Sequence, residues 1–369
     1  MARYPGLPML WLALGSSVAL LAAALAYQHA GVRRDAARCP APGRMLRVGG
    51  IGVHLRDLGP PAPAVPAASL GAETSTPAVV FLSGIATSSL NWSALQRDVA
   101  ARTRAIAYDR PGLGWSDLGP RGLTAADHAR HLHDVLQAGG IRPPVVLVAH
   151  SFGAFIAVLL AHSHPAEVAG AVLVDPITWQ EWAEPGPEQR YTLRGGALVS
   201  RAGAVLAALG VVRFSVTRFR GGAEGVGRAV LGSFGSRAAA AVSRVMGEVG
   251  KMPPDTWDAI QAHWSRPRSF IAMARHFAGL PASGREVRDA LGERGGPFTF
   301  PLVVLCAATA TDRQREWLGD LAAISTRGRV EVVPGAGHWI HLDRPEVVRN
   351  AVFEVLESAT PLDVAAARP

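Results

Sequence analysis

The segment Val145-Val146-Leu147-Val148-Ala149-His150-Ser151-Phe152-Gly153 carries the strongest structural signal in this sequence. Its aliphatic residues indicate a short buried strand, and the apolar run that follows Gly153 is typical of a helix. Ser151 would therefore lie in the turn between them, where a strained backbone presents a hydroxyl as a nucleophile. Strand and helix nearly collide there, so the neighbours must be small, as Ala149 and Gly153 are. The pattern alone also fits an ordinary turn with a capping serine.

Short apolar strands and helical segments alternate on both sides of this turn. We predict a hairpin over residues 45–48 and 53–56 that turns at Gly49-Gly50. Further strands are predicted at residues 78–82, 105–108, 145–148, 170–174, 302–306 and 330–333. Helices are predicted at residues 91–101, 124–138, 152–162, near 315–324 and from 345. Strands separated by helices predict an α/β fold, with a mostly parallel sheet covered by helices on both faces.

Two segments interrupt the alternation. Residues 60–77 are rich in Pro, Ala, Ser and Thr, which favours an extended flexible insertion. Residues 177–300 are too long for a loop in a compact domain and predict an inserted helical cap. The core would then comprise residues 44–176 and 301–358, followed by a tail at 359–369.

Residues 7–27 carry no charge over a length that crosses a bilayer as a helix. We expect residues 1–32 to form an N-terminal membrane anchor. A cleaved signal peptide is the alternative, although the stretch is long for one and has no distinct cleavage site. By the positive-inside rule, the arginines that follow would leave the rest of the chain in the cytoplasm. The side of the membrane stays open, since a domain can be exported whatever its flanks.

The chain has 369 residues, 49% of them hydrophobic, so it can bury a large core. Its net charge of +8 comes almost wholly from arginine, since Lys251 is the only lysine. No basic helix with interleaved aromatic residues accompanies this charge, so we expect no nucleic-acid partner and favour an anionic membrane surface. Cys39 and Cys306 lie far apart in the sequence and are predicted to be unpaired thiols.

A nucleophilic serine needs a base, and the base needs a group that fixes its tautomer. The segment Gly335-Ala336-Gly337-His338 follows the strand at residues 330–333, which places His338 in a loop at the same sheet edge as the serine. We therefore expect His338 to be the base. His341 and His150, which lies beside the serine, are expected to be structural.

Four segments carry a resemblance to a known family. They are Leu82-Ser83-Gly84-Ile85, Tyr108-Asp109-Arg110-Pro111-Gly112-Leu113-Gly114-Trp115-Ser116, the serine turn, and Gly337-His338-Trp339-Ile340-His341-Leu342-Asp343-Arg344-Pro345-Glu346. Together they resemble the α/β-hydrolase fold superfamily over about residues 45–357, with residues 177–300 in the place of its cap. In that superfamily the nucleophile comes in the middle of the chain and the catalytic histidine near its end, which is the order of Ser151 and His338 here. The segment Pro42-Gly43-Arg44 resembles, in particular, bacterial membrane-anchored members.

The resemblance implies an oxyanion hole made by the backbone N–H groups of Phe152 and Ile85. Ser83 stands where the superfamily usually has histidine, which removes a supporting ring and leaves the donor in place. The glycine turn at Gly112 and Gly114 is expected either to be a structural loop held by Asp109 and Arg110 or to contact the substrate.

Two carboxylates compete for the third catalytic position. Asp312 follows the superfamily's seventh strand, the commoner location, but the usual Gly-x-x-Asp is replaced by Ala307-Ala308-Thr309-Ala310-Thr311-Asp312. Asp175 ends the strand at residues 170–174, and its place resembles that in members that draw their acid from the sixth strand. We prefer Asp175 and keep Asp312 as the alternative acid.

These residues predict a serine hydrolase that acts on a carboxylic ester or a related acyl substrate through an acyl-enzyme. Thioester, amide, lactone or carbon–carbon bond hydrolysis would use the same triad, whereas relatives that open epoxides or cleave carbon–halogen bonds have aspartate as the nucleophile. An apolar small-molecule substrate, or simply the core of the cap, would explain the aromatic residues there: Trp179, Trp182, Phe214, Phe219, Trp257, Trp264 and Phe270.

A membrane-tethered binding protein that kept the fold and lost turnover is the alternative from another class, motivated by Ser83 and the irregular acid position. No cofactor is expected. No metal site is expected either, because His128, His131 and His133 do not share one helical face and no Cys or carboxylate cluster joins them.

Overall fold

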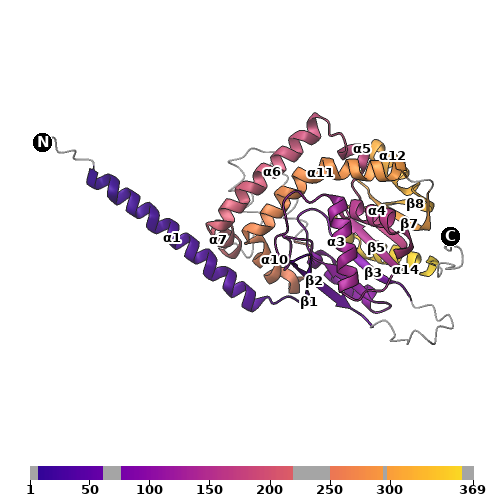
Figure 1. The fold of residues 1–369 in the computed structure, drawn as a ribbon, viewed down its shortest axis with the longest axis horizontal. Helices are drawn as coiled ribbons and strands as arrows, with labels where there is room; N and C mark the ends of the chain where they lie inside the picture. Colours follow the sequence, from indigo (N-terminus) through magenta and orange to yellow (C-terminus); the bar gives the residue numbers. More distant parts are fainter. Residues whose placement is uncertain (1–6, 61–75, 219–249, 294–296, 360–369) are drawn as a thin grey trace.

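The computed structural model describes residues 7–60, 76–218, 250–293 and 297–359, and an eight-stranded sheet lies at their centre (Figure 1). The strand order is β1-β2-β4-β3-β5-β6-β7-β8. β1 (Arg44–Val48) and β2 (Ile51–Leu58) pair antiparallel and turn at Gly49-Gly50, where both glycines have positive φ. β2 also runs antiparallel to β4, and every later pair is parallel. The predicted hairpin and mostly parallel sheet are confirmed.

The other strands follow the short apolar runs of the sequence. β3 (Ala78–Leu82) and β4 (Ala105–Tyr108) have the predicted bounds, and β5 (Val145–His150) and β6 (Val168–Val174) extend slightly beyond theirs. β7 (Phe298–Ala307) and β8 (Ser325–Val333) begin earlier than predicted. The first part of β8 contains polar, exposed residues, so hydrophobicity does not mark where it begins.

Helices cover both faces of the sheet. Successive side chains of a strand point to opposite faces, and accordingly Val80 and Leu82 pack in one core cluster whereas Val79 and Phe81 pack in another. The first cluster includes α3 (Ala125–Ala138), α4 (Gly153–Ser163) and α12 (Asp312–Ala322). The second includes α2 (Ser93–Ala100) and α14 (Pro345–Ser358), and the short helices η1 (Ser89–Trp92), η2 (Pro165–Glu167) and α13 (Ile340–Asp343) lie in connections.

The chain between β6 and β7, called the insertion below, is helical where the structure describes it. Its helices are α5 (Trp179–Trp182), α6 (Pro187–Ala208), α7 (Val211–Arg218), η3 (Pro254–Thr256), α10 (Trp257–Trp264) and α11 (Pro267–Glu293). α6 and α11 lie side by side (Figure 1). The insertion ends at Phe298, where β7 begins, and so before the predicted boundary at residue 300. Residues 219–249, and most of the predicted flexible segment 60–77, lie outside the described residues.

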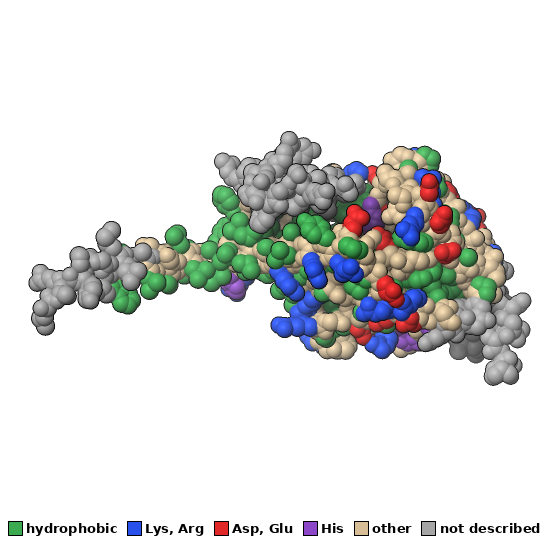
Figure 2. All heavy atoms as spheres, turned by 90° about the horizontal axis from the view of Figure 1, so that it is seen from above, with side chains coloured by type: hydrophobic (Ala, Val, Ile, Leu, Met, Phe, Trp, Pro, Cys, Tyr) green, Lys and Arg blue, Asp and Glu red, His purple; other side chains and the backbone are tan. Residues whose placement is uncertain are grey.

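α1 (Leu7–Arg38) is longer than the uncharged segment of the sequence and projects from the body of the molecule, with exposed hydrophobic side chains along it (Figure 2). Its last part contacts the insertion. Gln28 Nε2 donates a hydrogen bond to Ser265 O at 2.7 Å, and Arg213 Nε donates to Gln28 Oε1 at 2.9 Å. Arg213 also forms an ion pair with Asp35 at 2.7 Å. These contacts attach the carboxyl-terminal part of α1 to the body.

The membrane span predicted at residues 7–27 is not supported. Among the described residues, no single helix combines the length and the apolar composition that a membrane crossing requires. Two consecutive helices, Pro187–Ala208 and Val211–Thr217, meet these criteria only as a pair, and they are bent by 82° at the break between them.

Candidate active site

Ser151 lies in the tight turn that joins β5 to α4. Its φ of 53° is in the left-handed region, which residues other than glycine rarely adopt, and its N–H donates to Val174 O at 3.2 Å. A Cβ atom at Gly153 would lie 2.6 Å from Leu82 O, so the position requires glycine. A small residue is required at Gly153, as predicted, although the backbone that approaches it is the end of β3 rather than the strand before the turn.

His338 and Asp175 meet at the carboxyl edge of the sheet. Asp175 follows β6 with a φ of 40°, and His338 lies in the loop after β8. The His338 Nδ1 atom is 2.5 Å from Asp175 Oδ2, and the Ala307 N–H donates to Asp175 Oδ1 at 2.9 Å. Burial raises the pKa of the nearby Glu181 carboxyl, which interacts electrostatically with both residues. Because Nδ1 is the atom that contacts Asp175, Nε2 is the histidine nitrogen available to a further group.

Asp312 is not brought to the histidine. It is the first residue of α12, and its side chain is exposed. Within the described part of the chain, the carboxylate that pairs with His338 is that of Asp175. The structure therefore joins one of the two predicted acids to the predicted base.

His150 supports the loop that carries His338. Its Nε2–H donates to His338 O at 2.9 Å, and the two ring centroids are 4.7 Å apart. Burial holds the pKa of His150 well below its usual range and lowers the pKa of His341 to about 3. Both rings are therefore neutral and packed, in agreement with the structural roles predicted for them. Ser151 and His338 lie at one edge of the sheet, although no hydrogen bond joins their side chains.

The loop after β3 passes beside Ser151. A Cβ atom at Gly84 would lie 3.2 Å from Ser151 Cβ. The guanidinium of Arg110 donates to the carbonyl oxygens of Ser83 and Gly84, the latter at 2.6 Å. In a planar trans peptide the C=O and N–H groups point in opposite directions. The hydrogen bond to Gly84 O therefore fixes the direction of the Ile85 N–H, the predicted oxyanion donor, and the bond to Ser83 O holds the preceding peptide.

Arg110 has a role at this loop that the sequence analysis did not predict. It is 2% exposed, and its guanidinium carbon lies 5.3 Å from the centroid of the Phe152 ring. Burial lowers its pKa to about 10, which leaves it charged at neutral pH. Ser83 Oγ makes a second loop contact by donating to Ser88 O at 3.0 Å. Arg110 and Ser83 together support the loop from which the usual histidine is missing.

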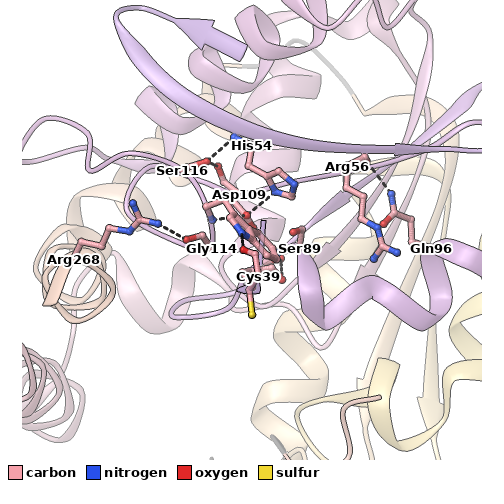
Figure 3. Close-up of polar contacts among 12 residues, drawn as sticks. Cys39, His54, Arg56, Ser89, Gln96, Asp109, Gly114, Ser116 and Arg268 are labelled. Carbon is pink, nitrogen blue, oxygen red and sulfur yellow. Dashed lines mark hydrogen bonds and ion pairs between the residues drawn. The ribbon is translucent and has the colours of Figure 1, made fainter. Parts of the chain in front are cut away.

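Asp109 organises the next loop (Figure 3). Its buried carboxylate accepts hydrogen bonds from His54 Nδ1 at 2.8 Å, the Ser89 N–H at 2.7 Å and the Trp115 N–H at 3.0 Å. Burial would raise the pKa of Asp109, but these hydrogen bonds, led by that of His54, lower it overall. A Cβ atom at Gly114 would collide with the carboxylate, so the loop closes tightly around it. These contacts give the loop a structural role, which is one of the two possibilities that the sequence left open.

A hollow lies between the loops that follow β3 and β8. Ala86 and Thr87 line it on one side, and Trp339 lines it on another. The insertion contributes Trp264 and Phe270. The other aromatic residues predicted for a pocket do not line this hollow, and Phe219 is outside the described residues. The aromatic residues of the insertion therefore divide between the hollow and other positions.

The α3 histidines lie in different environments. His128 is buried edge-on against the Phe152 ring, and burial lowers its pKa to about 3. Metal-ligating atoms do come within 4.8 Å of one another at His133, His164 and Glu167. The imidazole planes of His133 and His164 are nearly parallel, at 4°, and their centroids are 3.9 Å apart. One ion cannot lie in both ring planes, and Glu167 precedes β6, at the sheet edge opposite the candidate active site.

Residues 79–351 match the Alpha/beta hydrolase family. The chain belongs to this family. It is 24% identical over 291 residues to the sn-1-specific diacylglycerol lipase ABHD11 of Mus musculus, a match that covers 78% of this chain and 83% of the relative. A 36% identical match to YqjL of Bacillus subtilis covers 27% of this chain and only 39% of that relative. The hydrolase fold is shared with a thermophilic esterase from Thermogutta terrifontis, at 18% identity and a TM-score of 0.57, over 86% of this chain and 98% of that one.

Proposed function

We propose that this chain is a serine hydrolase that cleaves a carboxylic ester or a related acyl substrate, with Ser151 as nucleophile, His338 as base and Asp175 as the orienting acid. The contact between His338 Nδ1 and Asp175 Oδ2, at 2.5 Å and beside the Ser151 turn, carries this proposal. A carboxylate-bound histidine next to a serine in a strained strand-to-helix turn is the arrangement that activates a hydroxyl for acyl transfer. The names of two similar proteins, a diacylglycerol lipase and an esterase, support ester chemistry.

The first half-reaction is the acylation of Ser151. Asp175 holds the proton of His338 on Nδ1, so the bare Nε2 accepts the proton of the Ser151 hydroxyl. The serine oxygen bonds to the substrate carbonyl carbon, and the resulting oxyanion accepts hydrogen bonds from the N–H groups of Ile85 and Phe152. Collapse of this intermediate expels the alcohol, which takes the proton from Nε2 and leaves the acyl-enzyme.

Water completes the cycle at the same groups. It gives a proton to His338 Nε2 while its oxygen bonds to the acyl carbon. The second oxyanion collapses, the carboxylic acid leaves, and the proton returns to the Ser151 oxygen. The insertion serves as the cap over this chemistry, and the aromatic hollow beside the loops receives an apolar part of the substrate.

A chain-length series of p-nitrophenyl esters tests the proposal. The purified protein should hydrolyse at least one ester well above the buffer rate, and Ser151→Ala should lower kcat by about 10³-fold or more. Ser93→Ala removes another buried serine hydroxyl and is the matched control, for which we expect wild-type turnover. Equal rates for wild type and Ser151→Ala would rule out this nucleophile.

A further inference from the structure

The hollow beside the candidate active site has a largely apolar wall. Besides the aromatic residues, its lining includes Leu90, Leu113, Met252, Ile260 and Met273. A purely apolar chain would need no polar group in this wall.

Of the polar side chains in the lining, two contain buried atoms without a hydrogen-bond partner. Asn91 lies on η1 and is 8% exposed, and His263 lies on α10 and is 4% exposed. Among the described residues, neither the Asn91 side-chain nitrogen nor either ring nitrogen of His263 has a hydrogen-bond partner. Buried polar groups are normally paired, and leaving one unpaired is unfavourable. Asn91 and His263 are thus two such groups that line the same hollow.

The hollow is placed to receive part of a substrate bound at Ser151. Ala86 in its wall follows Gly84, which lies against Ser151, within the same loop. Trp339, on another part of the wall, directly follows His338. The wall to which Ala86 and Trp339 belong also contains Asn91 and His263.

We infer that the hollow selects substrates whose chain carries a hydroxyl group, which accepts a hydrogen bond from the Asn91 amide and donates one to His263. The inference rests on the proposed hydrolase function and names its substrate class. A hydroxyl fits both residues because it accepts and donates at once. Burial lowers the pKa of His263 to about 3, so the ring is neutral and keeps one bare nitrogen as an acceptor. The ring is held edge-on to Trp115, with centroids 4.3 Å apart.

The test compares p-nitrophenyl esters of a straight-chain acid with esters of the matching hydroxy acids, which carry the hydroxyl at successive carbons. For the best position, we expect the wild-type kcat/KM to exceed that of the unsubstituted ester by about 10- to 100-fold, the range for a buried polar group that is paired rather than left unpaired. Asn91→Leu and His263→Phe should each bring this ratio towards one.

Ser93→Ala is the matched control, because Ser93 is also buried with an unpaired hydroxyl but does not line the hollow. It should keep the wild-type ratio. A wild-type ratio near one at every hydroxyl position would overturn the inference while leaving the hydrolase proposal intact. If the ratio fell as far in Ser93→Ala as in Asn91→Leu, the inference would be overturned as well.

Binding provides a readout that does not depend on turnover. Calorimetry on Ser151→Ala should show that one free hydroxy acid of the series binds about 10-fold or more tightly than the unsubstituted acid. This result is expected even if no ester is hydrolysed, so failure of the hydrolase proposal and failure of the hydroxyl site can be told apart. Equal binding of all the acids, or binding of none, would refute the site.

Discussion

Replacing Arg110 with methionine isolates the role of the guanidinium in the loop after β3. Methionine keeps an unbranched apolar side chain beside Phe152, but it removes both donors to the carbonyl oxygens of Ser83 and Gly84. The change therefore leaves the proposed nucleophile, base and acid in place. Among the proposed catalytic groups, it affects the support of the predicted oxyanion donor at Ile85.

The structure sets the size of the effect. Complete removal of an oxyanion donor lowers kcat by about 10²- to 10³-fold. The Arg110 substitution should do less, because Gly84 O also accepts a hydrogen bond from Thr87 Oγ1 at 3.0 Å. We expect kcat to fall about 10- to 100-fold and KM to change by less than about threefold, since the oxyanion forms only in the transition state. The free energy of unfolding should fall by about 1 to 3 kcal/mol, because Ser83 O loses its side-chain donor in a buried setting.

Two further variants make this result specific. Arg110→Lys keeps a cation with fewer donors and should recover part of the lost kcat. Arg104→Met removes a largely buried arginine at the opposite end of β4, which pairs with Asp57 at 2.7 Å, and it should lower stability without lowering kcat. The assay is steady-state hydrolysis of a short p-nitrophenyl ester together with urea unfolding. A folded Arg110→Met variant with wild-type kcat would refute the reasoning.

Three other predictions concern the acid, the turn and acid stability. Asp175→Asn should lower kcat for ester hydrolysis by about 10⁴-fold, because the histidine loses its correct tautomer. Asp312→Asn should leave kcat near the wild-type value, and the reverse result would assign the acid to Asp312. Gly153→Ala places a Cβ atom 2.6 Å from Leu82 O, so it should lower the free energy of unfolding by about 1 to 3 kcal/mol or more. An unchanged midpoint of urea unfolding would contradict this close approach. The folded pKa of Asp109 is lowered from 3.8, so its contribution to stability is present above that pH and lost as the pH falls through the folded value. Urea unfolding from neutral pH downward should show this loss, and Asp109→Asn should lack that part of it.

The sequence allowed much of the sheet to be predicted, because its central strands are short apolar runs with polar or turn residues at their ends. β3 and β4 have the predicted bounds for this reason. The amino-terminal part of β8 could not be found in this way, because Thr326 and Arg327 are exposed while the strand pairs with β7. Pairing there depends on backbone hydrogen bonds across the sheet, which side-chain periodicity does not report.

The candidate site was predictable only in part. Ser151 and His338 stand in distinctive local patterns, and the structure brings their loops to one edge of the sheet. The choice between Asp175 and Asp312 depends on which strand end faces the histidine in space, so the sequence alone left it open. The contacts of Arg110 join a residue after β4 to the loop after β3. Such a contact follows from strand order rather than from any local pattern.

The central claim is that Ser151 is an activated nucleophile. Incubation with a fluorophosphonate probe, followed by mass spectrometry of the digested protein, tests it most directly. We predict one covalent adduct on Ser151, full labelling of the Ser93→Ala control, and strongly slowed labelling of His338→Ala. A folded wild-type protein that carries no adduct on Ser151 would contradict the account. Labelling of the His338→Ala variant at the wild-type rate would contradict it as well.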